Sequence, residues 1–319
     1  MVRYSPSQYS NLIKRLLPAC DGDASVAKRQ LIWMKEKIIQ DRNDPKNHQP
    51  LDQKEFLLLE NYIQQRVEQH KPLQYILGTQ PFYDLDILTR PPTLIPRWET
   101  EEWTHKLVSI LYPTWEIKNE NNQQQQRRRR IMDICTGTGC IALGLATHLP
   151  PQSTMIKGID ISQDAIQLAK ENLKRHQSML NGNEVNFQVQ DICDPTASLL
   201  LLNNGIAEKI DLFVSNPPYV THEEYNKLDP EVKHWEDKRA LVADHQGTFI
   251  HKKIIELVSQ HKKQFRVHDK DEENLPSLVM EIGGEHQVLT LTEELKKYDF
   301  KNIQVWKDLA GKDRLVLAN

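Results

Sequence analysis

An amide, two prolines and an aromatic ring stand where an apolar run of the sequence ends, at Asn216-Pro217-Pro218-Tyr219. The run, residues 210–214, is typical of a buried strand, and two prolines cannot continue it because each lacks a backbone N–H. The Asn216 side-chain oxygen and the rigid Pro217 carbonyl could each accept one N–H of a planar NH₂ group. Such a hold favours charge on the nitrogen, which is preorganisation rather than base catalysis. We expect the Tyr219 ring to stack on a planar substrate beside a cation, with Pro218 next to it.

A glycine turn precedes this stretch, between a strand candidate and a helix candidate. Gly137 and Gly139 would let a ligand approach the backbone closely. Carboxylates end the next two strand candidates: Asp160 is suited to ribose hydroxyls and Asp191 to the amine of adenine. These spacings predict a nucleoside cofactor site. The predicted cofactor residues are Asp133, Thr136, Gly137, Gly139, Asp160, Ile161, Asp191 and Asn216.

The residues alone leave two cofactors open. Gly137-x-Gly139-x-x-Ala142 also fits a dinucleotide fingerprint, so an NAD-dependent oxidoreductase is a competing interpretation. Asp133 comes before the turn, where a carboxylate would face a cation better than a pyrophosphate. S-adenosylmethionine carries positive charge at its amino group and its sulfonium, and is therefore favoured. With that methyl donor, the NH₂ held by Asn216 could belong either to adenine or to an amide.

The elements that position these residues alternate between strand and helix from Arg130 onward. Strand candidates are residues 131–135, 155–160, 185–191, 210–216 and 278–283, with helical stretches at 140–149, 163–180 and 247–263. This alternation predicts an α/β fold with a doubly wound, mostly parallel sheet. Two further strands around Gly311 predict a C-terminal antiparallel hairpin. Ligands of such sheets bind at the carboxyl ends of the strands, where Asp160 and Asn216 stand.

The first part of the chain reads differently. Residues 7–72 hold three amphipathic helical stretches, one of which begins with Asp52 as an N-cap and Glu55 three residues on. Alternating residues with several prolines then predict a β-hairpin linker, and a helix follows from about Glu99 to Leu111. The predicted domains are a helical bundle at 1–72, a linker at 73–98 and a methyltransferase domain at 99–319.

Composition excludes some classes of protein. The net charge of −3 over 319 residues argues against stable nucleic-acid binding, and no apolar run is long enough for membrane insertion. The four cysteines form no CxxC pair, so we expect reduced core thiols and no metal site. Residues 118–130 indicate either a solvated insertion, which is favoured, or a patch for RNA or targeting; residues 268–276 are a second, acidic insertion. The oligomeric state is not readable.

Residues 1–20 carry three basic residues, three serines and no acid. That composition is typical of a transit peptide, but the apolar spacing also fits the first helix of the bundle. Both interpretations stay open at this level.

Over residues 50–319 the chain resembles the HemK/PrmC class of protein-glutamine N-methyltransferases, which modify the glutamine of the Gly-Gly-Gln tripeptide in class-one peptide release factors. The matching segments follow in the family's order: PLQYILGTQPFYDLDI, LIPRWETE, DICTGTGCIAL, GIDIS, DLFVSNPPYV, WEDKRAL, MEIGGEHQ and KDLAGKDR. Cys135 stands where glycine is usual, Trp98 where proline is common, and Asp237 where Glu-Pro is typical. None of these departures touches Asn216 or Asp160.

The resemblance implies a Rossmann-like class I methyltransferase fold, S-adenosylmethionine as cofactor and a release factor as protein substrate. It also implies that Arg97 and Thr100 lie close to the site, and that the helical domain grips the partner. The insertions and the basic start suggest a eukaryotic, mitochondrial member. Methylation of the exocyclic amine of adenine in RNA or DNA is the alternative, since the same four residues serve that chemistry.

Overall fold

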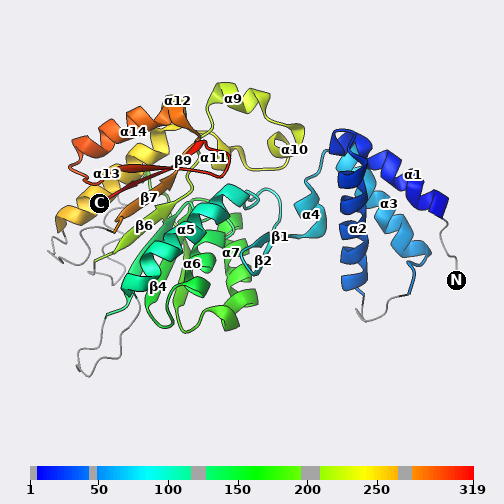
Figure 1. The fold of residues 1–319 in the computed structure, drawn as a ribbon, viewed down its shortest axis with the longest axis horizontal. Coiled ribbons are helices and arrows are strands. Elements are labelled where there is room, and N and C mark those ends of the chain that lie inside the picture. Colours follow the sequence, from blue (N-terminus) through cyan, green and yellow to red (C-terminus); the bar gives the residue numbers. More distant parts are fainter. Residues whose placement is uncertain (1–5, 43–48, 116–126, 195–208, 265–274) are drawn as a thin grey trace.

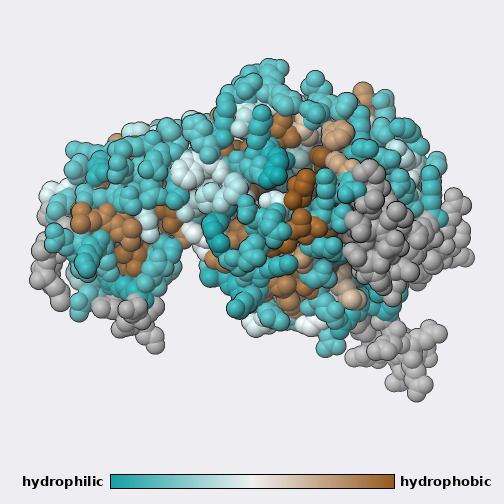
Figure 2. Space-filling model, turned by 180° about the vertical axis from the view of Figure 1, so that it is seen from behind, coloured by the Kyte–Doolittle hydropathy of each residue, from teal (hydrophilic) through white to brown (hydrophobic). Residues whose placement is uncertain are grey.

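The computed structural model describes residues 6–42, 49–115, 127–194, 209–264 and 275–319. A small helical lobe and a larger α/β lobe lie side by side, joined by a short helix and a hairpin (Figure 1). Figure 2 shows from behind that hydrophilic residues cover most of both lobes, with smaller hydrophobic patches on each lobe. Within the described ranges, no helix is long and apolar enough to cross a membrane.

A seven-stranded sheet forms the centre of the larger lobe, in the order β5-β4-β3-β6-β7-β9-β8. Five strands are parallel, and β9 pairs antiparallel with both β7 and β8. This confirms the predicted parallel sheet with a C-terminal antiparallel hairpin. The strands are β3 (Arg129–Ile134), β4 (Thr154–Asp160), β5 (Glu184–Val189), β6 (Leu212–Ser215), β7 (Leu278–Glu281), β8 (Gln304–Lys307) and β9 (Asp313–Ala318).

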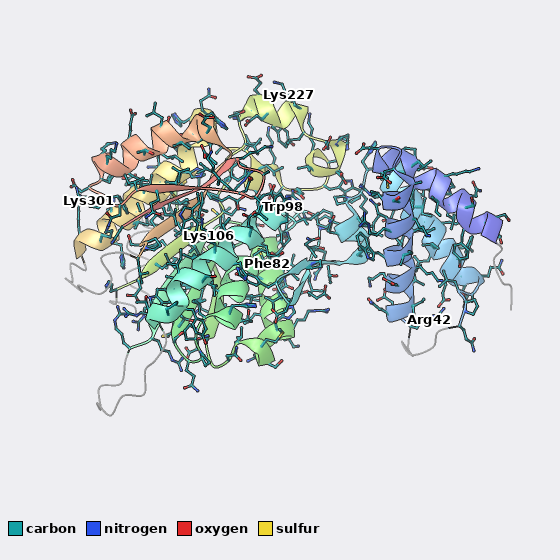
Figure 3. All side chains as sticks on the ribbon, viewed as in Figure 1. Arg42, Phe82, Trp98, Lys106, Lys227 and Lys301 are labelled. Atoms are coloured by element: carbon teal, nitrogen blue, oxygen red, sulfur yellow. The ribbon has the colours of Figure 1, made fainter. Side chains whose placement is uncertain are left out.

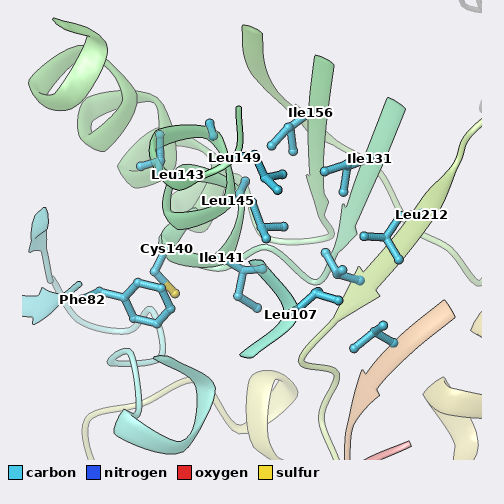
Figure 4. Close-up of a cluster of buried hydrophobic side chains, with 14 of the residues drawn as sticks. Phe82, Leu107, Ile131, Cys140, Ile141, Leu143, Leu145, Leu149, Ile156 and Leu212 are labelled. Atoms are coloured by element: carbon cyan, nitrogen blue, oxygen red, sulfur yellow. The ribbon is translucent and has the colours of Figure 1, made fainter. Parts of the chain in front are cut away.

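Helices cover both faces of this sheet, because successive strand residues point to opposite sides. Ile131 packs in a cluster with α5 (Trp98–Trp115), α6 (Cys140–His148) and α7 (Gln163–His176), part of which Figure 4 shows. Met132, the next residue, packs in a second cluster with α13 (Phe249–Gln264) and α14 (Glu285–Lys297). Strands buried on both faces explain why the sequence shows apolar runs rather than alternation.

The helical lobe contains α1 (Pro6–Leu16), α2 (Ala24–Gln40) and α3 (Gln53–Glu68), with a 3-10 turn at Leu17–Cys20. The predicted capping box at Asp52 and Glu55 is present. Leu12, Leu16 and Cys20 are buried in the core of the bundle. Residues 6–20 therefore form a structural part of the lobe, which favours the interpretation of this stretch as a domain helix.

The linker begins with α4 (Leu73–Leu77), which the sequence did not indicate, and continues as the predicted hairpin of β1 (Thr79–Phe82) and β2 (Leu85–Leu88). Phe82 is fully buried in the core beside the sheet. Figure 3 labels this residue where the hairpin meets the larger lobe. The Asn172 side chain bonds both the N–H and the carbonyl of Leu88. The hairpin is therefore fixed to the larger lobe.

Several other elements were not expected from the sequence. These are α14 and four short helices, α9 (His222–Lys227), α10 (Pro230–Lys233), α11 (Lys238–Leu241) and α12 (Asp244–Gly247), whereas the predicted helical stretch 163–180 ends in a 3-10 turn at Gln177–Met179. All four cysteines are free thiols, but Cys193 is exposed, so the prediction of core thiols was wrong for that residue. It lies just after β5, where the chain leaves the sheet.

The four arginines at 127–130 lie at the start of β3, and the insertion before them falls outside the described residues. Arg127 forms a bidentate pair with Asp211, and Arg128 pairs with Glu184. Asp211 also accepts a hydrogen bond from the backbone of Arg130. Asp211 immediately precedes β6 and Glu184 is the first residue of β5, so both acids give the basic run a structural partner in the sheet itself.

Candidate active site

A cavity of about 510 Å³ opens at the carboxyl ends of β3, β4, β5 and β6, within the range of roughly 300–1,000 Å³ typical of small-molecule sites. We call it the cofactor cavity. Six predicted site residues line it: Gly137, Asp160, Ile161, Asp191, Asn216 and Pro218. Residues 92–94 of the linker and residues 237–240 after α10 close its other sides.

Asp160 is held in this cavity by two backbone donors. Its Oδ2 accepts from the N–H of Gly137 at 2.9 Å and its Oδ1 from the N–H of Ser162 at 2.8 Å. Burial raises the pKa of Asp160, and these two hydrogen bonds act against that rise. Each carboxylate oxygen keeps a further lone pair for a ligand hydroxyl. Asp160 can therefore accept from a ribose hydroxyl, and its ribose-binding role stays a prediction.

Three predicted cofactor residues lie behind the cavity wall instead. A Cβ on Gly139, which has φ +80°, would come within 2.7 Å of the Phe187 ring, so this glycine serves the packing of helix on sheet. Thr136 donates from Oγ1 to Asp133 Oδ2 at 2.6 Å, and both side chains are buried. Burial raises the pKa of Asp133 to about 7. Asp133 thus braces the glycine turn rather than facing the cavity, contrary to our expectation.

Asn216 follows β6 and has one side of its amide fixed. Its Nδ2 donates to Thr100 Oγ1 at 3.1 Å, and Thr100, predicted to lie close to the site, is itself buried in α5. In the described part of the chain, nothing donates a hydrogen bond to the Asn216 side-chain oxygen or the Pro217 carbonyl. The two acceptors that a substrate NH₂ would need thus retain their hydrogen-bonding capacity.

Tyr219 is held by residues on the far side of the sheet edge. Its hydroxyl donates to Glu281 Oε1 at 3.2 Å, and its ring lies so near Gly283 that a Cβ there would come within 3.1 Å. Burial and the Glu281 charge raise the pKa of this phenol. Neither Tyr219 nor Pro217 lines the cofactor cavity. The ring therefore packs beside the cofactor cavity, and its stacking on the substrate stays a prediction.

Arg97 lies at the interface of the two lobes. It donates to Oε2 of the buried Glu236 at 2.5 Å. Both residues line a second hollow of about 370 Å³, the interface cleft, to which Arg66 and Trp33 contribute from the bundle and Glu231 from α10. Arg97 is thus not part of the cofactor cavity.

Sequence reasoning missed two buried polar residues near the site. Glu281 ends β7 and accepts from Thr100 Oγ1 at 2.6 Å, Trp103 Nε1 at 2.8 Å and Tyr219. Gln287 donates to the Tyr219 carbonyl at 2.9 Å and accepts from the N–H of Gly283 at 2.8 Å. The signal for Glu281 was available, because it is a carboxylate at the carboxyl end of an apolar strand, as Asp160 is.

Comparisons with known proteins agree with this geometry. A family model described as a methyltransferase domain matches residues 125–309. Among solved structures the likeness is weak: a METTL16 methyltransferase domain gives a TM-score of 0.46 at 17% identity, over 83% of this chain and 94% of that chain. The parallel sheet, the glycine turn and Asp160 make this protein a class I methyltransferase with a Rossmann-like fold.

The sequence relatives narrow the class. The "Release factor glutamine methyltransferase" of Flavobacterium psychrophilum is 33% identical, over 84% of this chain and 82% of that protein. The "Probable MRF1 mitochondrial N(5)-glutamine methyltransferase mtq1" of Schizosaccharomyces pombe is 30% identical, over 92% and 88%. The chain belongs to the release factor glutamine methyltransferase family.

The cofactor of this enzyme is S-adenosylmethionine, which supplies an electrophilic methyl group on a sulfonium. The cofactor cavity fits it in chemistry: Asp160 and Asp191 offer carboxylate oxygens, and Gly137 brings backbone to the cavity wall. Ile161, half exposed, adds an apolar surface at the same edge of the sheet.

Proposed function

We propose that this protein methylates the side-chain amide nitrogen of the glutamine in the Gly-Gly-Gln motif of a class-one peptide release factor, in support of translation termination. The observation that carries the proposal is Asn216 at the edge of the cofactor cavity. Its nitrogen is bound to Thr100, so its oxygen is available to a substrate NH₂.

An amide nitrogen is a poor nucleophile, because its lone pair is delocalised into the carbonyl group. In the proposed mechanism the Asn216 oxygen and the Pro217 carbonyl each accept one N–H of the substrate amide. Two fixed acceptors set the direction of the nitrogen lone pair and stabilise the positive charge that develops during transfer. As the bond between nitrogen and the methyl carbon forms, the bond between that carbon and the sulfonium sulfur would break, and one N–H proton of the positively charged nitrogen would then be lost to water. Since both acceptors are neutral, the protein supplies orientation and electrostatics rather than a general base.

Relatives named for release factors support glutamine over adenine as the acceptor, because they match nearly the whole chain and not only the cofactor turn. The net charge of −3 adds no attraction for nucleic acid. Neither point depends on the four residues at 216–219, which suit both acceptors.

The helical bundle, residues 1–72, would recognise the protein substrate. The interface cleft lies between this bundle and the loop after α9, so a partner held there would reach the catalytic lobe on the side of residues 219–240. The linker at 73–98 would then hold the two lobes at a fixed separation. We also propose a mitochondrial location, which the name of the fission yeast relative supports.

A methyl-transfer assay with a labelled methyl group tests the proposal. Purified protein is given a release factor, the same factor with the motif glutamine changed to asparagine, or transfer RNA. We expect label in the first substrate alone. Label in transfer RNA, without label in the release factor, would contradict the proposed function and favour adenine methylation.

A further inference from the structure

We propose that Glu281 and Thr100 set the orientation of the Asn216 amide, so that its oxygen and not its nitrogen faces the substrate. The two act as positioning residues for the transfer of the methyl group. This inference rests on the proposed function and adds a reason why the site selects an amide rather than a carboxylate.

The direction of each hydrogen bond follows from the chemistry of its partners, starting at Trp103. An indole N–H can only donate, so the 2.8 Å contact of Trp103 Nε1 makes Glu281 Oε2 an acceptor. Thr100 Oγ1 lies 2.6 Å from the same oxygen, a length typical of an O–H donating to a carboxylate. The single hydroxyl proton of Thr100 is therefore directed at Glu281.

With its proton directed at Glu281, the Thr100 oxygen has only lone pairs for Asn216. The 3.1 Å contact between Thr100 and Asn216 then requires an N–H from the amide. An amide has nearly the same shape in both orientations, so this polarity, rather than packing, decides which end points at the substrate. The amide oxygen is left on the opposite side.

Burial keeps this chain of hydrogen bonds from being replaced by water. Thr100, Trp103 and Glu281 are 2%, 4% and 1% exposed. The other carboxylate oxygen of Glu281 accepts from the Tyr219 hydroxyl at 3.2 Å. This hydrogen bond connects the network to the last residue of the 216–219 segment. A buried, fully partnered carboxylate holds its neighbours in one arrangement.

The reversed arrangement would present the NH₂ of Asn216 to the NH₂ of glutamine. Two donors cannot bond each other, so the substrate would lose one of its two acceptors. The same reversal would suit a carboxylate, which has only acceptors. The series of hydrogen bonds that links Trp103, Glu281, Thr100 and Asn216 therefore predicts that the wild-type site prefers glutamine to glutamate.

The test is the preference between two forms of a release factor, with Gln or Glu in the Gly-Gly-Gln motif. Binding of each to the full-length enzyme is measured by calorimetry with S-adenosylhomocysteine present. Thr100→Val removes the hydroxyl at nearly constant volume, and Thr100→Ser retains it. We expect Thr100→Val to lower the preference for Gln about tenfold or more, and Thr100→Ser to keep most of it.

A merely structural role for Thr100 would weaken binding of both forms equally, and an unchanged preference in Thr100→Val would overturn the inference. A second pair of variants, at Glu281, keeps the inference testable if Thr100→Val does not fold. In Glu281→Gln the Trp103 N–H fixes the new amide oxygen at the same place, so the preference should persist, whereas Glu281→Met should lose it. Equal preferences in this pair would also overturn the inference.

The measurement on the wild-type enzyme separates failure of the proposed function from failure of the inference about Thr100 and Glu281. A wild-type enzyme that binds neither form would overturn the proposed function and the inference with it. One that binds and methylates the Gln form, while the variants keep its preference, would overturn the inference alone.

Discussion

Two carboxylates that end parallel strands, Asp160 and Glu281, use their oxygens in different ways. Asp160 accepts from backbone N–H groups and lines the cofactor cavity. Glu281 accepts from three side chains and is wholly internal. Burial raises the pKa of both carboxyl groups. The first is a candidate for binding, and the second orders residues that bind.

Replacing Asn216 by alanine removes the acceptor on which the mechanism depends. We expect Asn216→Ala to slow methyl transfer by roughly 10²- to 10³-fold, the effect of deleting one preorganised group at a charge-developing atom. Affinity for S-adenosylhomocysteine should change far less, because Asp160 and Asp191 remain. Single-turnover kinetics and calorimetry measure the two quantities, and an unchanged transfer rate would refute the role of the amide.

The buried Asp133 predicts a dependence of stability on pH. Its pKa rises from 3.8 to about 7 in the folded state, so that state keeps a proton which the unfolded chain releases. The stability that this proton adds is complete below the unfolded pKa and is lost as the pH rises through the folded pKa. Asp133→Asn, neutral at every pH, lacks this loss.

Between pH 5 and 7, the free energy of unfolding of Asp133→Asn relative to wild type should therefore increase by roughly 1 kcal/mol per pH unit. Urea unfolding at several pH values measures it. Taking the difference between the proteins removes the contributions of the other buried carboxyl groups. A difference that does not vary with pH would show that Asp133 is already ionised in the folded state.

At the scale of elements, α12 and the start of α14 hold the 216–219 segment in place. His245, Gln246 and Gly247 all have positive φ, and the Gln287 side chain joins the Gln246 and Tyr219 carbonyls. A Cβ on Gly247 would come within 2.0 Å of the Tyr219 carbonyl oxygen. The loop thus approaches the catalytic segment so closely that only glycine fits at position 247.

Gly247→Ala should lower both stability and methyl transfer, by displacing Tyr219 and with it Asn216. The matched control is Gly311→Ala, which has nearly the same φ, +79° against +76°, but no atom within 4 Å of the added Cβ. We expect the control to cost only the left-handed strain of about 1–2 kcal/mol, with activity retained. Thermal unfolding and activity are compared; equal losses in both variants would contradict the steric explanation.

Most strands and long helices could be predicted, because the spacing of their apolar residues and the turn residues between them match the observed elements. Helix α14 could not, since the buried Gln287 and the 69%-exposed Leu289 blur its apolar face. Short helices such as α9 depend on a capping box at Thr221 and not on period.

The site was predictable where one strand end carries the signal, as at Asp160 and Asn216. The role of Glu281 was not, because its partner Thr100 is 181 residues away. The orientation of Tyr219 depends on the same distant carboxylate.

At the scale of the whole molecule, the segment that leaves the active site also contacts the helical lobe. Glu231 of α10 accepts from the buried Arg66 of α3 at 2.5 Å, and Trp235 donates to the Gln69 carbonyl at 2.9 Å. Figure 1 shows α10 reaching toward the bundle. The segment begins at Val220, which pairs with Val242 beside the cofactor cavity. The position of the bundle is therefore linked to the catalytic loop.

Glu231→Gln should weaken this link without touching the cofactor cavity. We expect the KM for a full-length release factor to rise about threefold to tenfold, because Glu231 is partly exposed and its pairing is only partly screened. The KM for a short Gly-Gly-Gln peptide should not change. Glu223→Gln is the control, since it breaks a fully solvated pair with Lys227, at the outer edge in Figure 3. An equal change for peptide and protein would contradict the role of the interface.

The most direct test of the account is to locate the methyl group on a release factor after incubation with the enzyme and S-adenosylmethionine. Fragmentation mass spectrometry of the Gly-Gly-Gln peptide should find one methyl group on the glutamine side chain with wild type, and almost none with Asn216→Ala. A methyl group on another residue, or equal modification by the Asn216 variant, would contradict the central claim.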